Sequence, residues 1–298
     1  MNPAARMTWD IAVELAMNAA MAVPLVRKWR LRRPRATPAF NGTDQQLERY
    51  AFAPLRHLLR LHGPVRGLSI AEIGPGDYLT SGFAMLAAGA ASYTAIERFV
   101  GDYRGPVAKG WYRAIEMRWP HVFGEMPWPA VLHGNSFPED CGNRVEVVDE
   151  PFERYQPRRR FDVVCSFQVS EHLSDIESFA QMHRRLLAPG GIAVHRVDFA
   201  PHDRWEAYPD PLTFLRPADW LWTLMGSHRG IPNRYRHHEF CAAFDAAGMT
   251  VVKAELETFD PKRIDWSKLT GRFRDMPEDS LRVASAVYLC RAAETLSS

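Results

Sequence analysis

The sequence predicts an α/β protein built on a Rossmann-like, doubly wound sheet that is mostly parallel. Short apolar runs at residues 68–73 and 91–97 flank a helix-forming stretch from Leu79 to Ala88. Strand, helix and strand within about 30 residues form a βαβ unit, and such a unit implies parallel strands. Apolar runs and helical patterns then alternate as far as residue 252. A last apolar run at 281–290 is expected to close the sheet as an antiparallel strand.

The composition indicates an ordinary globular protein. Of the 298 residues, 46% are hydrophobic and 24% are charged, as in typical water-soluble domains. The 37 basic and 35 acidic residues nearly cancel. No overall field would therefore attract nucleic acid, and we expect no nucleic-acid partner. The four cysteines form no CxxC pair, which favours reduced thiols and a cytoplasmic protein.

Residues 1–43 are expected to form a helical extension followed by a basic linker. The apolar stretch at 11–26 is interrupted by polar residues such as Glu14, so it falls short of the roughly 20 apolar residues of a membrane-spanning helix. Six of the nine residues from 27 to 35 are Arg or Lys. Two interpretations stay open. Residues 9–35 lie peripherally in the anionic inner face of a membrane, or the helix packs on the domain and the basic run is solvated.

Residues 44–298 are expected to form one domain with a regular order of elements. A helix at 44–61 precedes the first βαβ unit and ends before Pro64. A later helix at 176–187 is expected to stop at Pro189-Gly190-Gly191. The other expected elements are strands at 144–148, 161–166 and 192–198, a helix at 237–247 and a strand that begins at 249.

Two long connections interrupt this order, at about 98–143 and 199–236. Connections of this length in a compact domain are usually functional, and both leave the expected ligand edge of the sheet. We therefore expect them to wall the pocket of a second ligand, with aromatic faces for stacking. Alternatively, their tryptophans build ordinary cores: Trp111, Trp119, Trp128, Trp205, Trp220 and Trp222.

A glycine-rich turn, Glu72-Ile73-Gly74-Pro75-Gly76, ends the first expected strand. Glycines let a ligand approach bare backbone at a helix N-terminus, and open α/β sheets bind ligands at the carboxyl ends of their strands. A dinucleotide site usually has a third glycine, but Tyr78 and Leu79 follow here. Glu72 would also repel a pyrophosphate, whereas it suits a ligand with an amino group. Glu97, at the end of the second strand, suits the ribose hydroxyls of any adenosine ligand.

Four features in this order resemble class I S-adenosylmethionine-dependent methyltransferases. They are the glycine turn, Glu97, the run Phe161-Asp-Val-Val-Cys-Ser-Phe-Gln-Val-Ser-Glu-His-Leu-Ser-Asp and the run Leu186-Leu-Ala-Pro-Gly-Gly-Ile-Ala-Val-His. The resemblance covers residues 68–252 and the last strand, about two thirds of the chain. It implies an enzyme that takes a methyl group from S-adenosyl-L-methionine.

The resemblance also implies the residues that bind this cofactor. Gly74 and Gly76 would let the methionine part lie on the turn. Glu72 would lie near its amino group, and Glu97 would hold the ribose hydroxyls. The full set that it implies is Glu72, Gly74, Gly76, Glu97, Asp149, Glu150, Ser166 and Phe167.

The remaining members of this set follow the third and fourth strands. Asp149 or Glu150 would face the adenine, and Ser166 and Phe167 would line the methionine side. Tyr78 departs from the commonest pattern of the family, which often has a third glycine there. The local geometry of the turn is therefore left open.

Methyl transfer to a hydroxyl needs a positioned acceptor and a base that removes the proton. His172 follows the fourth strand and is the first candidate base, although it could simply orient its loop. His195 and Asp198 are further candidates, and their spacing of three residues points them to opposite sides of a strand. His202 and Asp203 follow on the next loop.

A metal site is not expected. The stretch 168–172 is similar to the Glu-x-x-Glu-His metal site of some methyltransferases, but Gln168 replaces the first carboxylate. An amide is a weaker ligand than a carboxylate for a hard cation such as Mg²⁺.

The acceptor is predicted from resemblance alone. The run at 214–222 and the stretch Pro232-Asn233-Arg234-Tyr235 are similar to bacterial methyltransferases of cell-surface glycan assembly. We therefore expect methyl transfer to an oxygen of a small-molecule, saccharide or lipid-linked acceptor. The alternatives are transfer to RNA or protein, a cofactor-binding subunit without activity, and an NAD-dependent oxidoreductase. The oligomeric state stays open.

Overall fold

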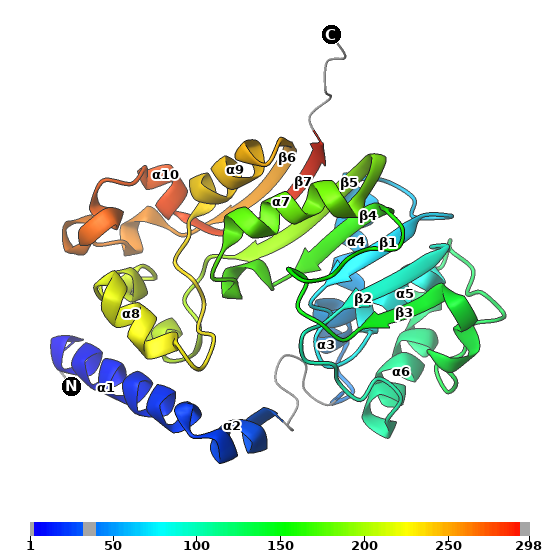
Figure 1. The fold of residues 1–298 in the computed structure, drawn as a ribbon, viewed down its shortest axis with the longest axis horizontal. Helices are drawn as coiled ribbons and strands as arrows, with labels where there is room; N and C mark the ends of the chain where they lie inside the picture. Colours follow the sequence, from blue (N-terminus) through cyan, green and yellow to red (C-terminus); the bar gives the residue numbers. More distant parts are fainter. Residues whose placement is uncertain (1–2, 32–39, 293–298) are drawn as a thin grey trace, which may run out of the picture.

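The computed structural model describes residues 3–31 and 40–292 (Figure 1). Its centre is a seven-stranded sheet in the order β3-β2-β1-β4-β5-β7-β6. The strands from β3 to β5 are parallel, and β7 runs antiparallel to both β5 and β6. The predicted doubly wound sheet with an antiparallel last strand is confirmed. The strands are β1 (Ser69–Ile73), β2 (Ser92–Ile96), β3 (Val145–Val148), β4 (Phe161–Phe167), β5 (Leu187–Asp198), β6 (Met249–Thr258) and β7 (Val283–Ala292).

Helices cover both faces of the sheet (Figure 1). One face carries α3 (Asp44–Leu47), α4 (Ala53–Leu61), α5 (Thr80–Ala87) and α6 (Pro106–Val122). The other face carries α7 (Ile176–Leu186) and α9 (His237–Ala246). The remaining α-helices are α1 (Pro3–Ala22), α2 (Pro24–Leu31), α8 (Asp219–Gly226) and α10 (Glu278–Leu281). Short non-α turns of helix lie at Glu48–Phe52, Glu139–Arg144, Ser170–His172, Asp203–Ala207, Thr213–Leu215, Pro261–Arg263, Trp266–Lys268 and Gly271–Arg274.

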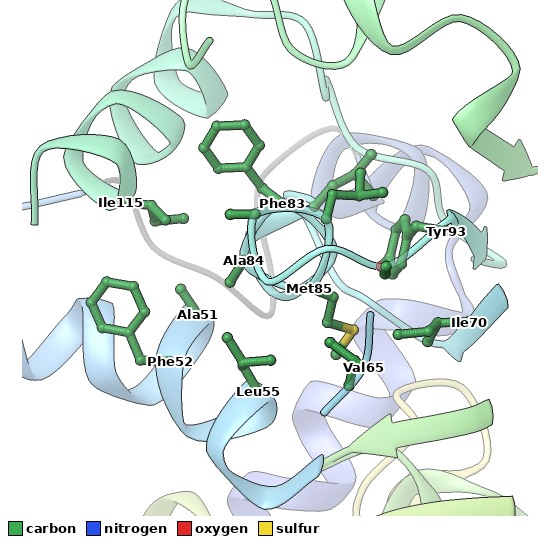
Figure 2. Close-up of a cluster of buried hydrophobic side chains, with 14 of the residues drawn as sticks. Ala51, Phe52, Leu55, Val65, Ile70, Phe83, Ala84, Met85, Tyr93 and Ile115 are labelled. Carbon is green, nitrogen blue, oxygen red and sulfur yellow. The ribbon is translucent and has the colours of Figure 1, made fainter. Parts of the chain in front are cut away.

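A large apolar core lies between the sheet and the first group of helices. Figure 2 shows Phe83 and Ala84 of α5 between Ile115 of α6 on one side and Phe52 and Leu55 on the other. Leu55 belongs to α4, and Phe52 ends the turn of helix directly before it. All five side chains are almost completely buried. The apolar runs of the sequence therefore pack in a helix–sheet–helix arrangement of three layers, as an open α/β sheet requires.

Most predicted elements lie where the sequence placed them, with two instructive differences. The helix predicted at 44–61 is continuous but passes through a π-helical turn at Glu48–Phe52, directly before Pro54, whose ring cannot fit a regular helix interior. Pro189-Gly190-Gly191 does not separate a helix from a strand. It lies inside β5, which starts at Leu187 and bulges before pairing with β4 again.

The connection at 98–143 contains α6, which links β2 to β3. Its tryptophans pack in the core, as the second of our two interpretations predicted. Trp111 and Trp119 are fully buried, and Trp128 packs against the same cluster. The aromatic rings of Trp119 and Trp128 meet edge to face at 5.4 Å.

The connection at 199–236 forms a separate small core together with residues from 259–281. Trp205 and Trp222 are buried in it, whereas Trp220 is exposed. Helix α1 packs against α8 of this connection, so the N-terminal extension is part of the folded structure (Figure 1). None of the helices in the described ranges is both long and apolar enough to cross a membrane.

Gly82 of α5 supplies a close helix–strand contact. A Cβ atom at this position would lie 2.4 Å from the ring of Tyr93 on β2, whereas a Cβ at Gly110 of α6 would meet nothing within 4 Å. We predict that Gly82→Ala lowers the free energy of unfolding by about 1–3 kcal/mol because the buried ring must shift. Gly110→Ala should be neutral or stabilising, because alanine favours a helix. Thermal unfolding of both variants tests this, and equal melting temperatures for the two would contradict it.

Candidate functional site

The glycine turn lies between β1 and α5, at the carboxyl edge of the parallel strands. Gly74 and Gly76 have φ values of 68° and 82°, in the left-handed region that other residues seldom adopt. A Cβ at Gly74 would lie 2.7 Å from the side chain of Val169. The turn therefore touches the loop after β4, and glycine is required for that contact.

Glu72 is 3% exposed and lies beneath this turn. Its Oε2 atom accepts hydrogen bonds from the hydroxyls of Ser81 on α5 (2.5 Å) and Tyr93 on β2 (2.6 Å). Burial raises the pKa of Glu72 to about 7. The carboxyl group thus ties β1 to its two neighbours, and its second oxygen takes part in neither bond.

Glu97 follows β2 and lies beside the glycine turn. Its Oε2 accepts a hydrogen bond from the backbone N–H of Gly76 (3.2 Å), and its Oε1 accepts one from that of Phe99 (2.8 Å). The end of β3 is adjacent, because the N–H of Glu97 donates to the carbonyl of Val148. The next residue is Asp149, which is exposed. The turn, Glu97 and the end of β3 therefore meet at one edge.

Ser166 and His195 do not face this edge. Both are fully buried, and the Ser166 hydroxyl lies 2.8 Å from Nδ1 of His195. The His195 ring stacks on Phe244 of α9, and its burial lowers its pKa well below the usual value. His195 is therefore a core residue between β5, α7 and α9 and cannot contact an acceptor. Only the backbone of Ser166 remains near the ligand edge.

Phe167 points to the opposite face of the sheet from Ser166. Its ring stacks on His57 of α4 at 6.2 Å and packs against the α4–α6 core. Burial and the nearby Arg60 lower the pKa of His57 to about 4. The side chain of Phe167 is half-buried at the end of β4, where it borders the turn side of the sheet.

The loop after β4 is held by Asn233. Its side chain donates to the carbonyls of Ser170 (2.8 Å) and Leu173 (2.9 Å), and its backbone N–H donates to that of Glu171. Glu171 is 2% exposed, and neither of its carboxylate oxygens has a hydrogen-bond partner in the described structure. Burial raises its pKa to about 8. Glu171 is therefore protonated at neutral pH.

Polar side chains from β4, β5 and the following loops meet next to this carboxyl group. Asp198 accepts hydrogen bonds from the backbone of Ala200 (2.9 Å) and the amide of Gln168 (3.4 Å). Nε2 of His202 lies 3.8 Å from Asp198 and has no hydrogen-bond partner in the described residues. The rings of His202 and His172 are 5.5 Å apart. Gln168 has a φ of 58°, a strained value of the kind found at functional sites.

His172 lies at the outer side of this cluster and is exposed to solvent. Desolvation by the surrounding protein is the main cause that lowers the pKa of His172 to about 4, and the nearby His202 lowers it further. Because the side chain is partly solvated, we take from this only that His172 is neutral at pH 7. The structure thus brings His172 and Asp198 together and separates both from His195.

A small pocket opens beside the cluster, between α1 and the connection at 199–236. His202 and Asp203 line one side, and Glu14 of α1 lines another. The apolar part of the wall consists of Ala200, Trp205, Phe214, Trp222, Ile231 and Pro232. The sequence suggested the tryptophans of this connection, but nothing in it indicated a contribution from α1.

Comparison with known proteins decides the family. A family model described as a methyltransferase domain matches residues 46–254, which is more than half of the chain. The chain belongs to this methyltransferase family. An S-adenosylmethionine-dependent methyltransferase from Mesorhizobium loti is 15% identical, with 80% of this chain and 97% of that one covered and a TM-score of 0.44. No curated protein matches the chain.

A second solved structure is the 1,6-didemethyltoxoflavin-N1-methyltransferase of Burkholderia thailandensis. It is 14% identical to this chain, the match covers 85% of this chain and 83% of that one, and the TM-score is 0.47. Membership of the methyltransferase family confirms the expected enzyme class and S-adenosyl-L-methionine as its cofactor. It rules out the NAD-dependent oxidoreductase that the sequence left as an alternative.

Among residues 3–31 and 40–292 of this methyltransferase, no group of three or more His, Cys, Asp or Glu side chains is arranged to hold a metal ion. The cluster around Asp198 is instead held by hydrogen bonds from Gln168 and Ala200.

The buried Glu171 gives the methyltransferase a pH-dependent stability. Its pKa is raised from about 4.5 in the unfolded chain to about 8 when folded, so the folded state keeps a proton that the unfolded state loses. This contribution to stability is present at low pH and is lost as the pH rises from 4.5 to 8. We predict that the melting temperature of Glu171→Gln exceeds that of wild type by several degrees more at pH 8.5 than at pH 5. Calorimetry with the exposed Glu177→Gln as control tests this, and parallel pH profiles of wild type and Glu171→Gln would contradict it.

Proposed function

We propose that this methyltransferase moves a methyl group from S-adenosyl-L-methionine to an oxygen of a small-molecule, saccharide or lipid-linked acceptor. The observation that carries the proposal is the contact between Gly74 and Val169. It brings the glycine turn against the loop after β4, whose Gln168 and His172 belong to the cluster around Asp198 and His202. A donor on one side and an acceptor on the other would then meet within a single site.

The residues at the turn fit the cofactor. Gly74 and Gly76 leave the backbone open to the methionine part, and the free-standing oxygen of Glu72 would take up its amino group. Glu97 is already oriented by two backbone N–H groups, so it would bind the ribose hydroxyls at little entropic cost. Asp149 or Glu150 would face the adenine. When bound, S-adenosyl-L-methionine supplies an electrophilic methyl group on a sulfonium.

The protein's own part in the reaction is to position a hydroxyl and remove its proton. We assign the proton acceptor to Asp198, which β5 and Gln168 hold in place. His202 would accept or donate a hydrogen bond at the acceptor, because its buried Nε2 has no partner among the described residues. His172 would position His202 through their ring contact. In-line attack of the acceptor oxygen on the methyl group depends mainly on this orientation, and the protein itself forms no covalent bond.

The polar side of the small pocket supports a hydroxyl-bearing acceptor. Asp203 and the buried Nε2 of His202, which has no partner among the described residues, supply hydrogen-bonding groups for an acceptor hydroxyl. Asn233, from the stretch that resembles glycan methyltransferases, holds the loop that carries His172. We also propose a cytoplasmic location, supported by four cysteines that are all free.

The role of Asp198 is tested by Asp198→Asn. We predict that kcat falls by about 10²–10⁴-fold, because an amide cannot accept the proton, while the affinity for S-adenosylhomocysteine stays within about twofold. The assay is a methyl-transfer screen with labelled cofactor on saccharides and lipid-linked sugars, with Asp260→Asn as an exposed control. Wild-type activity in Asp198→Asn, or labelling of RNA or protein instead of these acceptors, would contradict the proposal.

A further inference from the structure

Helix α1 turns its polar side toward the protein. Asp10, Glu14 and Asn18 lie on successive turns, and each is at most 5% exposed. Glu14 binds Arg204 (2.6 Å) and Arg229, and Asp10 accepts a hydrogen bond from Tyr208. These ion pairs hold α1 in a fixed orientation, because breaking them would leave the buried Glu14 carboxylate without a partner.

Asn18 completes this contact with α8. Its amide donates to the carbonyl of Leu224 (2.7 Å) and to the hydroxyl of Ser227 (2.9 Å), and its oxygen accepts from the N–H of His228 (2.8 Å). The polar side chains of α1 thus form hydrogen bonds and ion pairs with the domain and do not face water.

The opposite side of α1 is exposed, and the side chains at its centre are uncharged; Arg6, at its border, pairs with Asp10. Trp9 is 62% exposed and Met17 is 42% exposed. The other exposed positions are small or weakly polar: Ala5, Thr8, Ala12, Ala16, Ala19 and Ala20. A surface helix of a globular protein normally has the reverse arrangement, with its charged side in water.

Helix α2 follows α1 directly, exposes further apolar side chains and adds positive charge. Leu25 is 79% exposed, and Val26 and Trp29 are exposed as well. Arg27 starts the run of six basic residues within 27–35. Next to α1, helix α8 presents Trp220, which is 69% exposed. In Figure 1, α1 and α2 follow one another along one edge of the molecule.

We propose that α1 and α2 lie in the plane of an anionic lipid bilayer, with Trp9 and Leu25 inserted at the headgroup level and Arg27 of α2 against the lipid phosphates. Helices that bind anionic membranes have apolar and aromatic residues on one side and Lys or Arg nearby. A second copy of the chain fits less well, because a symmetric contact on this surface would bring two basic runs together. The two interpretations of the N-terminus are therefore compatible, since the helix packs on the domain and still presents an apolar surface.

The orientation of α1 in the membrane also determines how an acceptor would reach the pocket, and this one consequence rests on the proposed function. Glu14 lines the pocket beside His202, and it lies on the side of α1 opposite Trp9. The pocket would then be separated from the lipid surface by roughly the 10 Å diameter of one helix. A lipid-linked acceptor would reach it without leaving the membrane.

The membrane contact is tested by flotation of the full-length protein with vesicles of phosphatidylcholine containing 30% phosphatidylglycerol, compared with phosphatidylcholine alone. We predict binding to the anionic vesicles that falls with added salt and is at least tenfold weaker in the double variant Trp9→Glu/Leu25→Glu. Both side chains are mainly exposed, so melting temperatures should stay within a few degrees. Met117→Glu, at a 69% exposed position of α6, is the matched control and should bind as wild type does.

Binding needs no cofactor or acceptor, so this test is independent of methyl transfer. The proposal is overturned if wild type does not float with anionic vesicles, or if the double variant floats as well as wild type. It is also overturned if Met117→Glu loses binding to the same extent, or if the double variant abolishes a dimer seen by light scattering while wild type ignores vesicles. Binding that is retained by a catalytically inactive Asp198→Asn protein supports it.

Discussion

The buried carboxyl group of Glu72 is the constraint on which the site depends. It accepts hydrogen bonds from Ser81 on α5 and Tyr93 on β2, so one side chain fixes three consecutive elements of the βαβ unit. Gly82 brings α5 close enough to Tyr93 for both bonds to form. A buried acid without such partners would be strongly destabilising. The glycine turn directly above is therefore held at a defined distance from β2 and its terminal Glu97.

The loop after β4, beside which we propose that the acceptor binds, contains a buried carboxyl group of the opposite kind. Asn233 satisfies the backbone of the loop after β4, yet it leaves the carboxyl group of Glu171 without a partner. Such a group favours a neutral, protonated form, which keeps negative charge away from Asp198 when the site is empty. A buried polar group without a partner and with a shifted pKa is typical of functional sites.

The sequence predicted the parts of the fold that depend on local patterns. Strands that end on Glu72 and Glu97 were recognisable because a buried strand, a glycine turn and a helix follow one another within a few residues. The role of His195 was not predictable, because its burial against Phe244 depends on how α9 packs on the sheet. Trp111 likewise looks the same in a sequence whether it lines a pocket or fills a core.

The N-terminal helix shows a further limit of such analysis. Periodicity indicates that α1 has two unlike sides, but it cannot tell which side faces the domain. Arg204 and Arg229 decide this, and they lie about 200 residues away from Glu14 in the chain. For the same reason no pattern in the sequence indicated that α1 would line the pocket beside His202.

The central claim is that the glycine turn and Glu97 hold S-adenosyl-L-methionine. Calorimetric titration of wild type and Glu97→Ala with S-adenosylhomocysteine tests this claim most directly. We predict that the variant binds more than tenfold more weakly, since two charge-assisted hydrogen bonds worth about 1.5–3 kcal/mol each are lost. Glu97→Gln, which keeps an oxygen for Gly76, should bind with intermediate affinity. An unchanged affinity in Glu97→Ala would contradict the assignment of the site.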